Sequence, residues 1–171
     1  MPIDDKFKEI MQSNTGCAVI MAGSDSDEKH IEKIVESLRE YGIPYSVRIC
    51  SAHKQPEKLI ALIMEYNDIK GSAAYIAVAG GTDALSGTLS FHALGPVISC
   101  PPDVPNQSCL TNPPGSSNAY IARAGNVGKF VAQIYSSNNP KFKELLEKNN
   151  ALKIGYLEKV DAEFQIKYKG D

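Results

Sequence analysis

The sequence predicts a three-layer α/β/α fold with a central parallel sheet and a C-terminal helical tail. Short apolar segments alternate with amphipathic ones over residues 16–137, a pattern typical of strands joined by helical crossovers. The apolar segments are nearly continuous, as in strands that are covered on both faces. The 171 residues suit one domain (1–171), in which an N-terminal extension (1–15) and C-terminal helices (138–171) flank the α/β core.

The first half of the core is predicted to hold strands that alternate with amphipathic helices. The helices carry apolar residues three or four positions apart on one face. Gly42 can end the first of them, and Pro56 is favoured in the first turn of the second. The expected elements are strands over 16–22, 45–50 and 72–79 and helices over 26–41 and from residue 56 onward.

The second half of the core is predicted from a glycine-rich turn, a short strand and a helix. The turn "GGTDALSG" leads into a short helical stretch, and a fourth strand follows over 96–99. A helix is expected over 119–135, with a fifth strand as an alternative near its beginning. A charged helix then covers 140–148, and the tail over 149–171 is also expected to be helical.

The unusual loops all follow predicted strands, so they meet at one edge of the sheet. Strands joined by right-handed crossovers run parallel, which gives a flavodoxin-like arrangement. Ligands of such sheets bind beyond the carboxyl ends of the strands, near the point where the strand order reverses. The loops at that edge are "GSDSD" (23–27), "SAHK" (51–54), "AGGTDALSG" (79–87) and "CPPDVPNQSCLTNPPG" (100–115). We therefore expect the functional site at this edge.

Composition and charge exclude several classes of partner. The net charge of −2 comes from 18 basic and 20 acidic residues spread along the chain, so we expect no nucleic acid partner. No apolar stretch approaches the length of a membrane span, and the N-terminus is too polar for a signal peptide, so no membrane partner is expected. Cys17, Cys50, Cys100 and Cys109 lack metal-site spacing and are expected to be buried free thiols of a cytoplasmic protein.

The loop "GSDSD" places two hydroxyls and two carboxylates where a helix begins. Gly23 permits a sharp turn, and Ser24, Asp25 or Ser26 can cap the first helical amides. Capping alone would explain one such residue, but four exceed what a cap needs, so the whole run is a candidate for substrate binding: Ser24, Asp25, Ser26 and Asp27. A phosphate would contact Ser24 and nearby amides, and an aspartate would face ribose hydroxyls or an amine. The loop thus indicates a small nucleotide, although it matches neither the dinucleotide nor the Walker pattern that would make this signal specific.

The loop "SAHK" offers a proton-transfer group beside a cation. His53 can exchange protons near neutral pH, and Lys54 supplies positive charge for a phosphate. A surface histidine is the alternative interpretation. His30, in a first helical turn, and His92 are weaker candidates for which a structural role is expected.

The third loop, "AGGTDALSG", carries the glycine pair Gly80 and Gly81. These glycines allow the backbone to approach a flat ligand, although a tight turn alone would also explain them. The fourth loop, over 100–115, is rich in turn-forming residues and poor in charge. It is expected to be a lid or pocket wall, or else a rigid subunit contact.

Together, "GSDSD", "SAHK", "AGGTDALSG" and "CPP", with their spacing over about 17–135, resemble the aminoimidazole ribonucleotide carboxylase and mutase family of purine biosynthesis. One branch of that family carboxylates the ring carbon directly with CO₂. The other, a mutase, moves a carboxylate from the exocyclic nitrogen to that carbon. Residues 26–30, 51–54, 84–87 and 100–102 favour the direct branch, which reads "SAHK" where the mutase reads "SAHR".

The chain departs from the direct branch in two loops. Gly81-Thr82-Asp83 stands where that branch has Arg-Ser-Asn. The glycine pair Gly80-Gly81 resembles the mutase instead. Thr111, in the segment that replaces "LRMPSG", stands where that branch has its second arginine. Both changes remove positive charge near the place where a carboxylate would sit.

The resemblance also implies roles for individual residues. It implies proton transfer by His53, with neither metal nor organic cofactor. The implied substrate contacts are Ser24 and Asp27, then Ser51 and Lys54 at the phosphate end, and Gly80, Gly81 and Leu85 around the aminoimidazole ring. The family forms homo-octamers with shared active sites, and residues 141–171 are a candidate for an exchanged helix.

The leading hypothesis is direct carboxylation of 5-aminoimidazole ribonucleotide to 4-carboxy-5-aminoimidazole ribonucleotide in purine biosynthesis. A mutase that acts on the N-carboxylated substrate is the first alternative. A divergent nucleotide-binding module, which lost turnover with the two arginines, is an alternative of another class. A carboxylase of some other nucleotide, such as a pyridine mononucleotide, ranks below these.

Overall fold

Five parallel strands form the central sheet, in the order β2-β1-β3-β4-β5. The computed structural model describes residues 2–170. The strands confirm the predicted parallel sheet, including the alternative of a fifth strand near residue 119. Their bounds are β1 Ala18–Ala22, β2 Tyr45–Ile49, β3 Ala74–Val78, β4 Val97–Ser99 and β5 Ala119–Tyr120.

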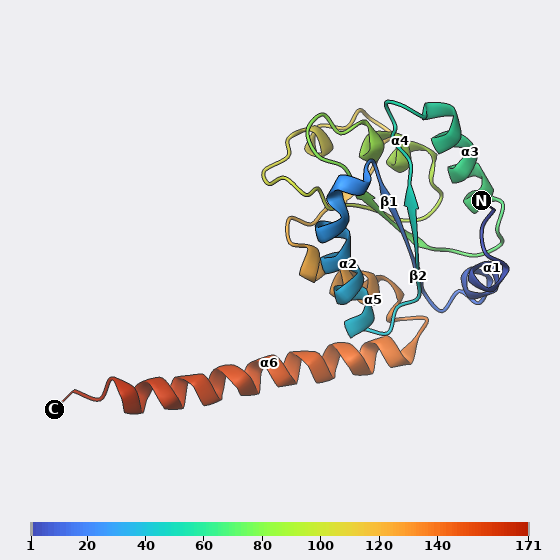
Figure 1. Cartoon of the computed structure of the whole chain (residues 1–171). Coiled ribbons are helices and arrows are strands. Elements are labelled where there is room, and N and C mark those ends of the chain that lie inside the picture. The colour runs from blue at the N-terminus through green and yellow to red at the C-terminus, as the bar shows by residue number, and fades with distance from the viewer. Residues whose placement is uncertain (1, 171) are drawn as a thin grey trace.

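Helices cover both faces of this sheet, which gives the predicted three layers (Figure 1). Alternate residues of β1 point to opposite faces, because successive side chains of a strand do so. Ala18, Ile20 and Ala22 pack in one core with α2 and α5, whereas Val19 and Met21 pack in the other with α1, α3 and α4. The helices of these layers are α1 Asp5–Gln12, α2 Glu28–Glu40, α3 Pro56–Asn67, α4 Ala84–His92 and α5 Val127–Tyr135.

Helix α1 lies in the N-terminal extension, where no helix was predicted. The side chain of Asp4 caps it by accepting a hydrogen bond of 3.1 Å from the amide of Phe7. Phe7 and Met11 lie four positions apart, so they share one face, and both are buried in the core that α3 completes. The extension is therefore a packed part of the α/β fold.

The predicted helix over 119–135 is wrong in its first part. Residues Ala119–Tyr120 form β5, which pairs with β4 through Ile98 and Ser99. A 3-10 turn over Ala124–Asn126 follows, and α5 begins only at Val127. The unpaired backbone groups of β4 are satisfied by this short strand, a long-range requirement that helical periodicity does not contain.

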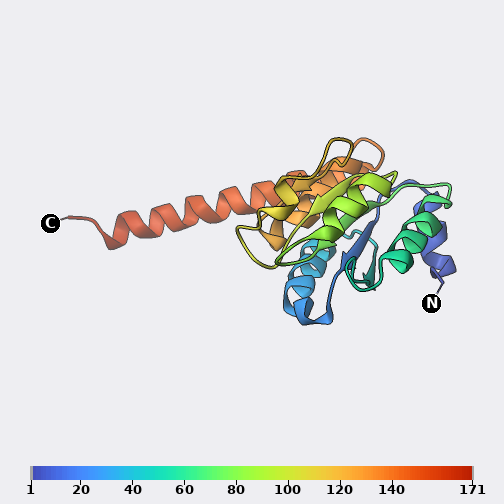
Figure 2. The ribbon, with the colours of Figure 1, turned by 90° about the horizontal axis from the view of Figure 1, so that it is seen from above.

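The C-terminal segment forms one continuous helix, α6, over Pro140–Lys167. The expected helical tail is thus confirmed, but there is no break after residue 148. No proline follows Pro140 within the helix, and Gly155 alone does not interrupt it. Phe142 packs against the core, whereas most of α6 projects away from the α/β body (Figures 1 and 2).

All four cysteines are free and buried, as the sequence predicts. Burial raises the pKa of the Cys17 thiol to about 12, and burial likewise raises that of Cys100 to about 12. Across residues 2–170, none of the helices has both the length and the apolar character needed to cross a membrane.

Candidate functional site

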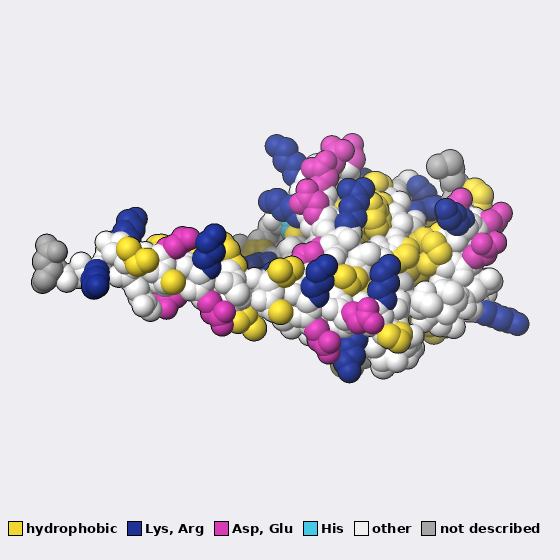
Figure 3. Space-filling view, turned by 90° about the horizontal axis from the view of Figure 1, so that it is seen from below, with side chains coloured by type: hydrophobic (Ala, Val, Ile, Leu, Met, Phe, Trp, Pro, Cys, Tyr) yellow, Lys and Arg dark blue, Asp and Glu magenta, His cyan; other side chains and the backbone are white. Residues whose placement is uncertain are grey.

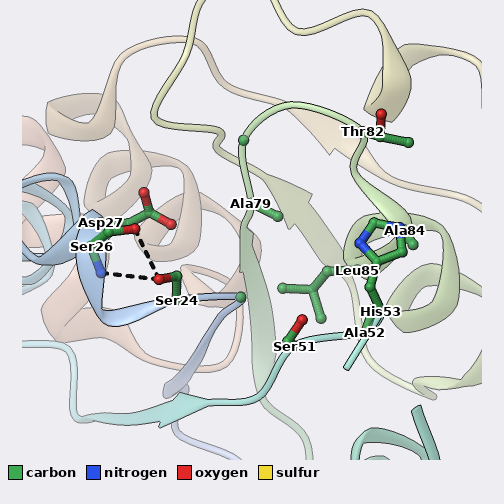
Figure 4. Close-up of a pocket in the computed structure, with 12 residues that line it drawn as sticks. Ser24, Ser26, Asp27, Ser51, Ala52, His53, Ala79, Thr82, Ala84 and Leu85 are labelled. Atoms are coloured by element: carbon green, nitrogen blue, oxygen red, sulfur yellow. Dashed lines mark hydrogen bonds between the residues drawn. The ribbon is translucent and has the colours of Figure 1, made fainter. Parts of the chain in front are cut away.

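A pocket of about 290 Å³ lies at the carboxyl ends of β1, β2 and β3. Strand β1 lies between β2 and β3. The chain passes from β1 to β2 on one side and then crosses to β3 on the other side, so the strand order reverses at β1. The pocket is therefore at the predicted edge and at the predicted point of the sheet (Figure 4). It is lined by Gly23, Ser24, Ser26, Asp27, Ser51, Ala52, His53, Ala79, Gly80, Thr82, Ala84 and Leu85.

Most of the predicted site residues line this one pocket, although they come from three separate loops. Three of them do not: Asp25, Lys54 and Gly81 are exposed and lie beside lining residues in the chain. The predicted residues that the structure brings together are Ser24, Ser26, Asp27, Ser51, His53, Gly80 and Leu85.

The loop after β1 contains a local hydrogen-bond network centred on Ser24. Its hydroxyl oxygen accepts from the Ser26 amide at 3.2 Å and from the Ser26 hydroxyl at 2.9 Å. The Ser24 hydroxyl itself donates to the Asp25 carboxylate at 3.3 Å. Ser24 thus caps the 3-10 turn Asp25–Asp27, as the capping interpretation predicts, and helix α2 starts at Glu28 rather than at Ser26.

Asp27 precedes α2 but makes no side-chain cap hydrogen bond to it. Its carboxylate lines the pocket instead. Burial raises the pKa of Asp27; the charge of His30 opposes this shift, and the charges of Asp103 and Asp25 add to it. The free protein therefore holds a carboxylate whose ionisation is disfavoured, and hydrogen-bond donors from a ligand would favour the ionised form.

The loop after β2 places an imidazole at the opposite side of the pocket from Ser24 and Asp27 (Figure 4). His53 is exposed, so its ring is accessible to a molecule in the pocket. The half-buried Ser51 accepts a hydrogen bond of 3.3 Å from the amide of Lys54, which fixes the shape of this loop. An accessible imidazole facing polar side chains can exchange protons with a bound ligand.

The glycine turn after β3 forms the third wall. Asp83 is buried and caps α4 by accepting a hydrogen bond of 2.8 Å from the Ser86 amide, while Leu85 closes the pocket floor. A Cβ at Gly80 would lie 3.2 Å from Asp103 Oδ1, and Gly81 has a φ of +64°. Gly80 thus lies close to the loop after β4, and this close approach favours a small residue at position 80.

The loop after β4 contains two residues that the sequence analysis did not single out, Asp103 and Asn106. Asp103 accepts a hydrogen bond of 2.8 Å from the Gly81 amide, and Asn106 donates one of 3.1 Å to the Gly81 carbonyl. The loop supports the wall of the pocket from outside. Thr111, farther along the same loop, does not line the pocket. Within residues 2–170, no group of three or more His, Cys, Asp or Glu side chains is arranged to hold a metal ion.

The fold and the pocket together define a three-layer α/β protein with a ligand-sized site at the switch point of its sheet. The family model described as AIR carboxylase matches residues 17–153 of the sequence. The chain belongs to the AIR carboxylase family of purine biosynthesis, which confirms the resemblance carried by the four loops.

The relatives that match this chain are named for different activities. The phosphoribosylaminoimidazole carboxylase of Treponema denticola is 36% identical over 124 residues, which cover 69% of this chain and 78% of that protein. A bifunctional carboxylase and succinocarboxamide synthetase of Mus musculus is 33% identical over 144 residues, 80% of this chain but 34% of that longer protein. The N5-carboxyaminoimidazole ribonucleotide mutase of Aquifex aeolicus is 32% identical over 140 residues, which cover 75% of this chain and 81% of that protein.

The fold is also that of a solved family member. The crystal structure of Treponema denticola PurE superimposes with a TM-score of 0.81 at 30% sequence identity, covering 86% of this chain and 98% of that one. This similarity confirms the predicted flavodoxin-like arrangement.

Proposed function

We propose that the chain carboxylates 5-aminoimidazole ribonucleotide directly with CO₂, giving 4-carboxy-5-aminoimidazole ribonucleotide. The observation that carries this proposal is the position of His53. Its accessible imidazole lines the same pocket as Ser24, Asp27 and Ser51, in a chain that belongs to the AIR carboxylase family. A proton acceptor and a set of polar groups for a ribonucleotide therefore face one small volume.

The reaction needs one carbon–carbon bond and one proton transfer. The electron-rich ring carbon attacks CO₂, and the new bond leaves that carbon with both a carboxylate and a proton. Neutral His53 then accepts the proton, and the electron pair of the broken C–H bond restores the aromatic ring. A positioned imidazole accelerates such a step by roughly 10²–10⁴-fold, and holding CO₂ beside the ring adds to this.

The remaining pocket residues would hold the nucleotide. The hydroxyls of Ser24, Ser26 and Ser51 suit phosphate and ribose oxygens, and Lys54 adds positive charge beside the pocket. Asp27 and the neighbouring Asp25 suit ribose hydroxyls or the ring amine. Another set would contact the flat ring: Gly80 and Leu85 in the wall, with Gly81 beside them.

The SAHK loop, residues 51–54, favours the direct reaction, whereas the charge of the pocket does not separate the two candidate reactions. The residues that line the pocket include Asp27 and no lysine or arginine, and the charges of Asp25 and Asp103 act on Asp27. CO₂ is neutral, but both reactions end in the same carboxylated product, which these carboxylates would repel in either case. The mutase remains the second candidate because the Aquifex relative carries that name.

We also propose a homo-octamer in the cytoplasm. Helix α6 exposes apolar side chains along the part that projects from the body, which suits burial against other copies of the chain. Four free thiols suit a reducing compartment.

The test follows product absorbance after purified protein is mixed with aminoimidazole ribonucleotide and bicarbonate, without ATP. We expect product from the native protein and a kcat lowered by roughly 10²–10⁴-fold in His53→Asn. His92→Asn, which removes an imidazole outside the pocket, should retain activity.

Absence of product from the native protein would contradict direct carboxylation. The N-carboxylated substrate then separates the alternatives. Its conversion to the same product would identify a mutase. Nucleotide binding without conversion of either substrate would identify a binding module.

A further inference from the structure

Both backbone polar groups of Gly81 are hydrogen-bonded to the loop after β4. Its amide donates to Asp103 Oδ2 at 2.8 Å. Its carbonyl oxygen accepts from Asn106 Nδ2 at 3.1 Å and from Ser108 Oγ at 3.2 Å. We call Asp103, Asn106 and Ser108 the Gly81 clamp. It joins two loops that are more than twenty residues apart in the chain.

The clamp is internally connected as well. Asn106 Nδ2 donates a second hydrogen bond, of 2.9 Å, to Asp103 Oδ1, and Asn106 Oδ1 accepts one of 3.0 Å from the Ser108 amide. Asn106 is only 3% exposed, and its amide group uses both donors and its acceptor. The hydrogen bond from Gly81 and then that from Asn106 lower the pKa of Asp103, so its carboxylate stays ionised and remains an acceptor.

The space where a side chain at position 81 would lie is open. Gly81 has a φ of +64°, and a Cβ built on it would meet no atom of the described residues within 4 Å. The left-handed conformation is accessible to glycine but is not enforced by it. The clamp supplies the hydrogen bonds that select this conformation. Gly80 and Thr82, on either side of Gly81, both line the pocket.

We propose that Asp103 and Asn106 are positioning residues that hold the Gly80–Thr82 wall of the pocket in its binding shape. They act through the Gly81 backbone and not by contact with the ligand. The identity of the ligand, aminoimidazole ribonucleotide, rests on the proposed function. The dependence of the wall on the clamp does not.

The first experiment measures amide hydrogen exchange over residues 79–83 in the full-length native protein and in Asp103→Ala. Asp103 is exposed, so its replacement should leave the core intact. We expect exchange in this segment to be about two- to tenfold faster in Asp103→Ala, the effect of losing hydrogen bonds of ordinary strength, while β3 is unchanged. Asp103→Asn keeps one acceptor for the Gly81 amide but loses the acceptor for Asn106 Nδ2, so its exchange rate should lie between those of the native protein and Asp103→Ala.

Two further variants complete the comparison. Asp68→Ala removes an exposed aspartate at the end of α3, remote from the pocket, and should match the native protein. Ser108→Ala removes only one of the two bonds to the Gly81 carbonyl, so it should accelerate exchange less than Asp103→Ala. Because this change is small, it also decides the proposal if Asp103→Ala does not fold.

The second experiment measures the Kd for aminoimidazole ribonucleotide. We expect Asp103→Ala to bind about two- to tenfold more weakly than the native protein, with Asp103→Asn between the two. Unchanged exchange over 79–83 in both Asp103→Ala and Ser108→Ala would overturn the proposal. So would faster exchange with native affinity. If the native protein itself fails to bind the nucleotide, the proposed function fails, and exchange alone still decides whether the clamp holds the wall.

Discussion

Asp27 combines partial burial with neighbouring negative charge at the rim of the pocket. Burial is the main cause of its raised pKa, and the charges of Asp103 and Asp25 add to it. Its carboxylate does not compensate by capping α2. A ligand that donates hydrogen bonds to this group would relieve the cost of its charge, which is why we assign it to ribose hydroxyls or an amine.

The raised pKa predicts how Asp27→Asn changes stability with pH. Between the ordinary aspartate pKa of 3.8 and the raised pKa, the folded protein binds more protons at this site than the unfolded chain does. Native stability contributed by Asp27 therefore falls as pH rises through that window. The asparagine variant cannot ionise there, so its free energy of unfolding should increase relative to the native value as pH rises above 3.8.

Urea unfolding of both proteins at several pH values from acid to neutral measures this difference. Asp68→Asn, at the exposed end of α3, is the matched control and should not follow the same trend. If the stability of Asp27→Asn relative to the native protein stays constant or decreases with rising pH, the raised pKa of Asp27 is contradicted.

At the residue scale, sequence reasoning identified side chains that follow strands but missed the clamp. Ser24, Ser51 and His53 could be placed because the carboxyl ends of parallel strands share one edge. Asp103 and Asn106 could not be matched to Gly81, because nothing in the local pattern specifies which loop contacts which. Polar side chains three positions apart in a loop of this edge were the available signal.

The backbones of helices α2 and α5 lie in close contact at Ser37 and Gly128. The Gly128 amide donates a hydrogen bond of 3.0 Å to the Ser37 hydroxyl. A Cβ at Gly128 would lie 1.8 Å from the Ser37 carbonyl oxygen, so only glycine allows the two backbones to approach this closely. The position of α5 against α2 depends on this contact.

Gly128→Ala should therefore destabilise the protein. The added methyl group must push the helices apart, and overpacking of this kind costs about 1–3 kcal/mol in the free energy of unfolding. Equilibrium urea unfolding measures the change. Gly125→Ala is the control, because a Cβ there meets no atom of the described residues within 4 Å. Equal stabilities of the two variants would show that α5 does not rely on the contact.

At the element scale, the errors of prediction arose where long-range pairing or packing decides the structure. Residues 119–120 form β5 because the backbone groups of β4 require hydrogen-bond partners, although helical periodicity continues across these residues. Phe7 and Met11 are apolar positions in a polar segment, and their burial against α3 makes α1 part of the core. Among elements with strong local patterns, α2 was predicted within about two residues at each end, and α3 begins at the predicted residue 56.

For the whole molecule, α6 sets the shape, because it extends well beyond the α/β body (Figure 2). Apolar and charged side chains are interspersed along it, as Figure 3 shows. Tyr156, Leu157 and Phe164 are each more than 50% exposed and lie three or four positions from Val160, so they share its face. Such a face is suited to contact with another copy of the chain.

Val160→Glu should weaken self-association, because it places a charge at the centre of this face. Sedimentation velocity at several protein concentrations measures the size of the assembly. Ala151→Glu is the control: nine residues earlier, it lies two and a half turns away and so on the opposite face. We expect smaller species for Val160→Glu and native-sized species for Ala151→Glu. Native-sized assemblies of both would rule out this face as the contact.

The four buried thiols can report where the protein opens, because a thiol reacts only after it becomes exposed. A thiol reagent cannot reach Cys17, at the start of β1, until the sheet is exposed. Cys100 and Cys109 instead flank the loop that supports the pocket wall. Labelling at these two positions before Cys17 would mark partial loosening of the loop, whereas simultaneous labelling would mark cooperative unfolding. The order in which these cysteines are labelled thus distinguishes local motion at the site from global unfolding.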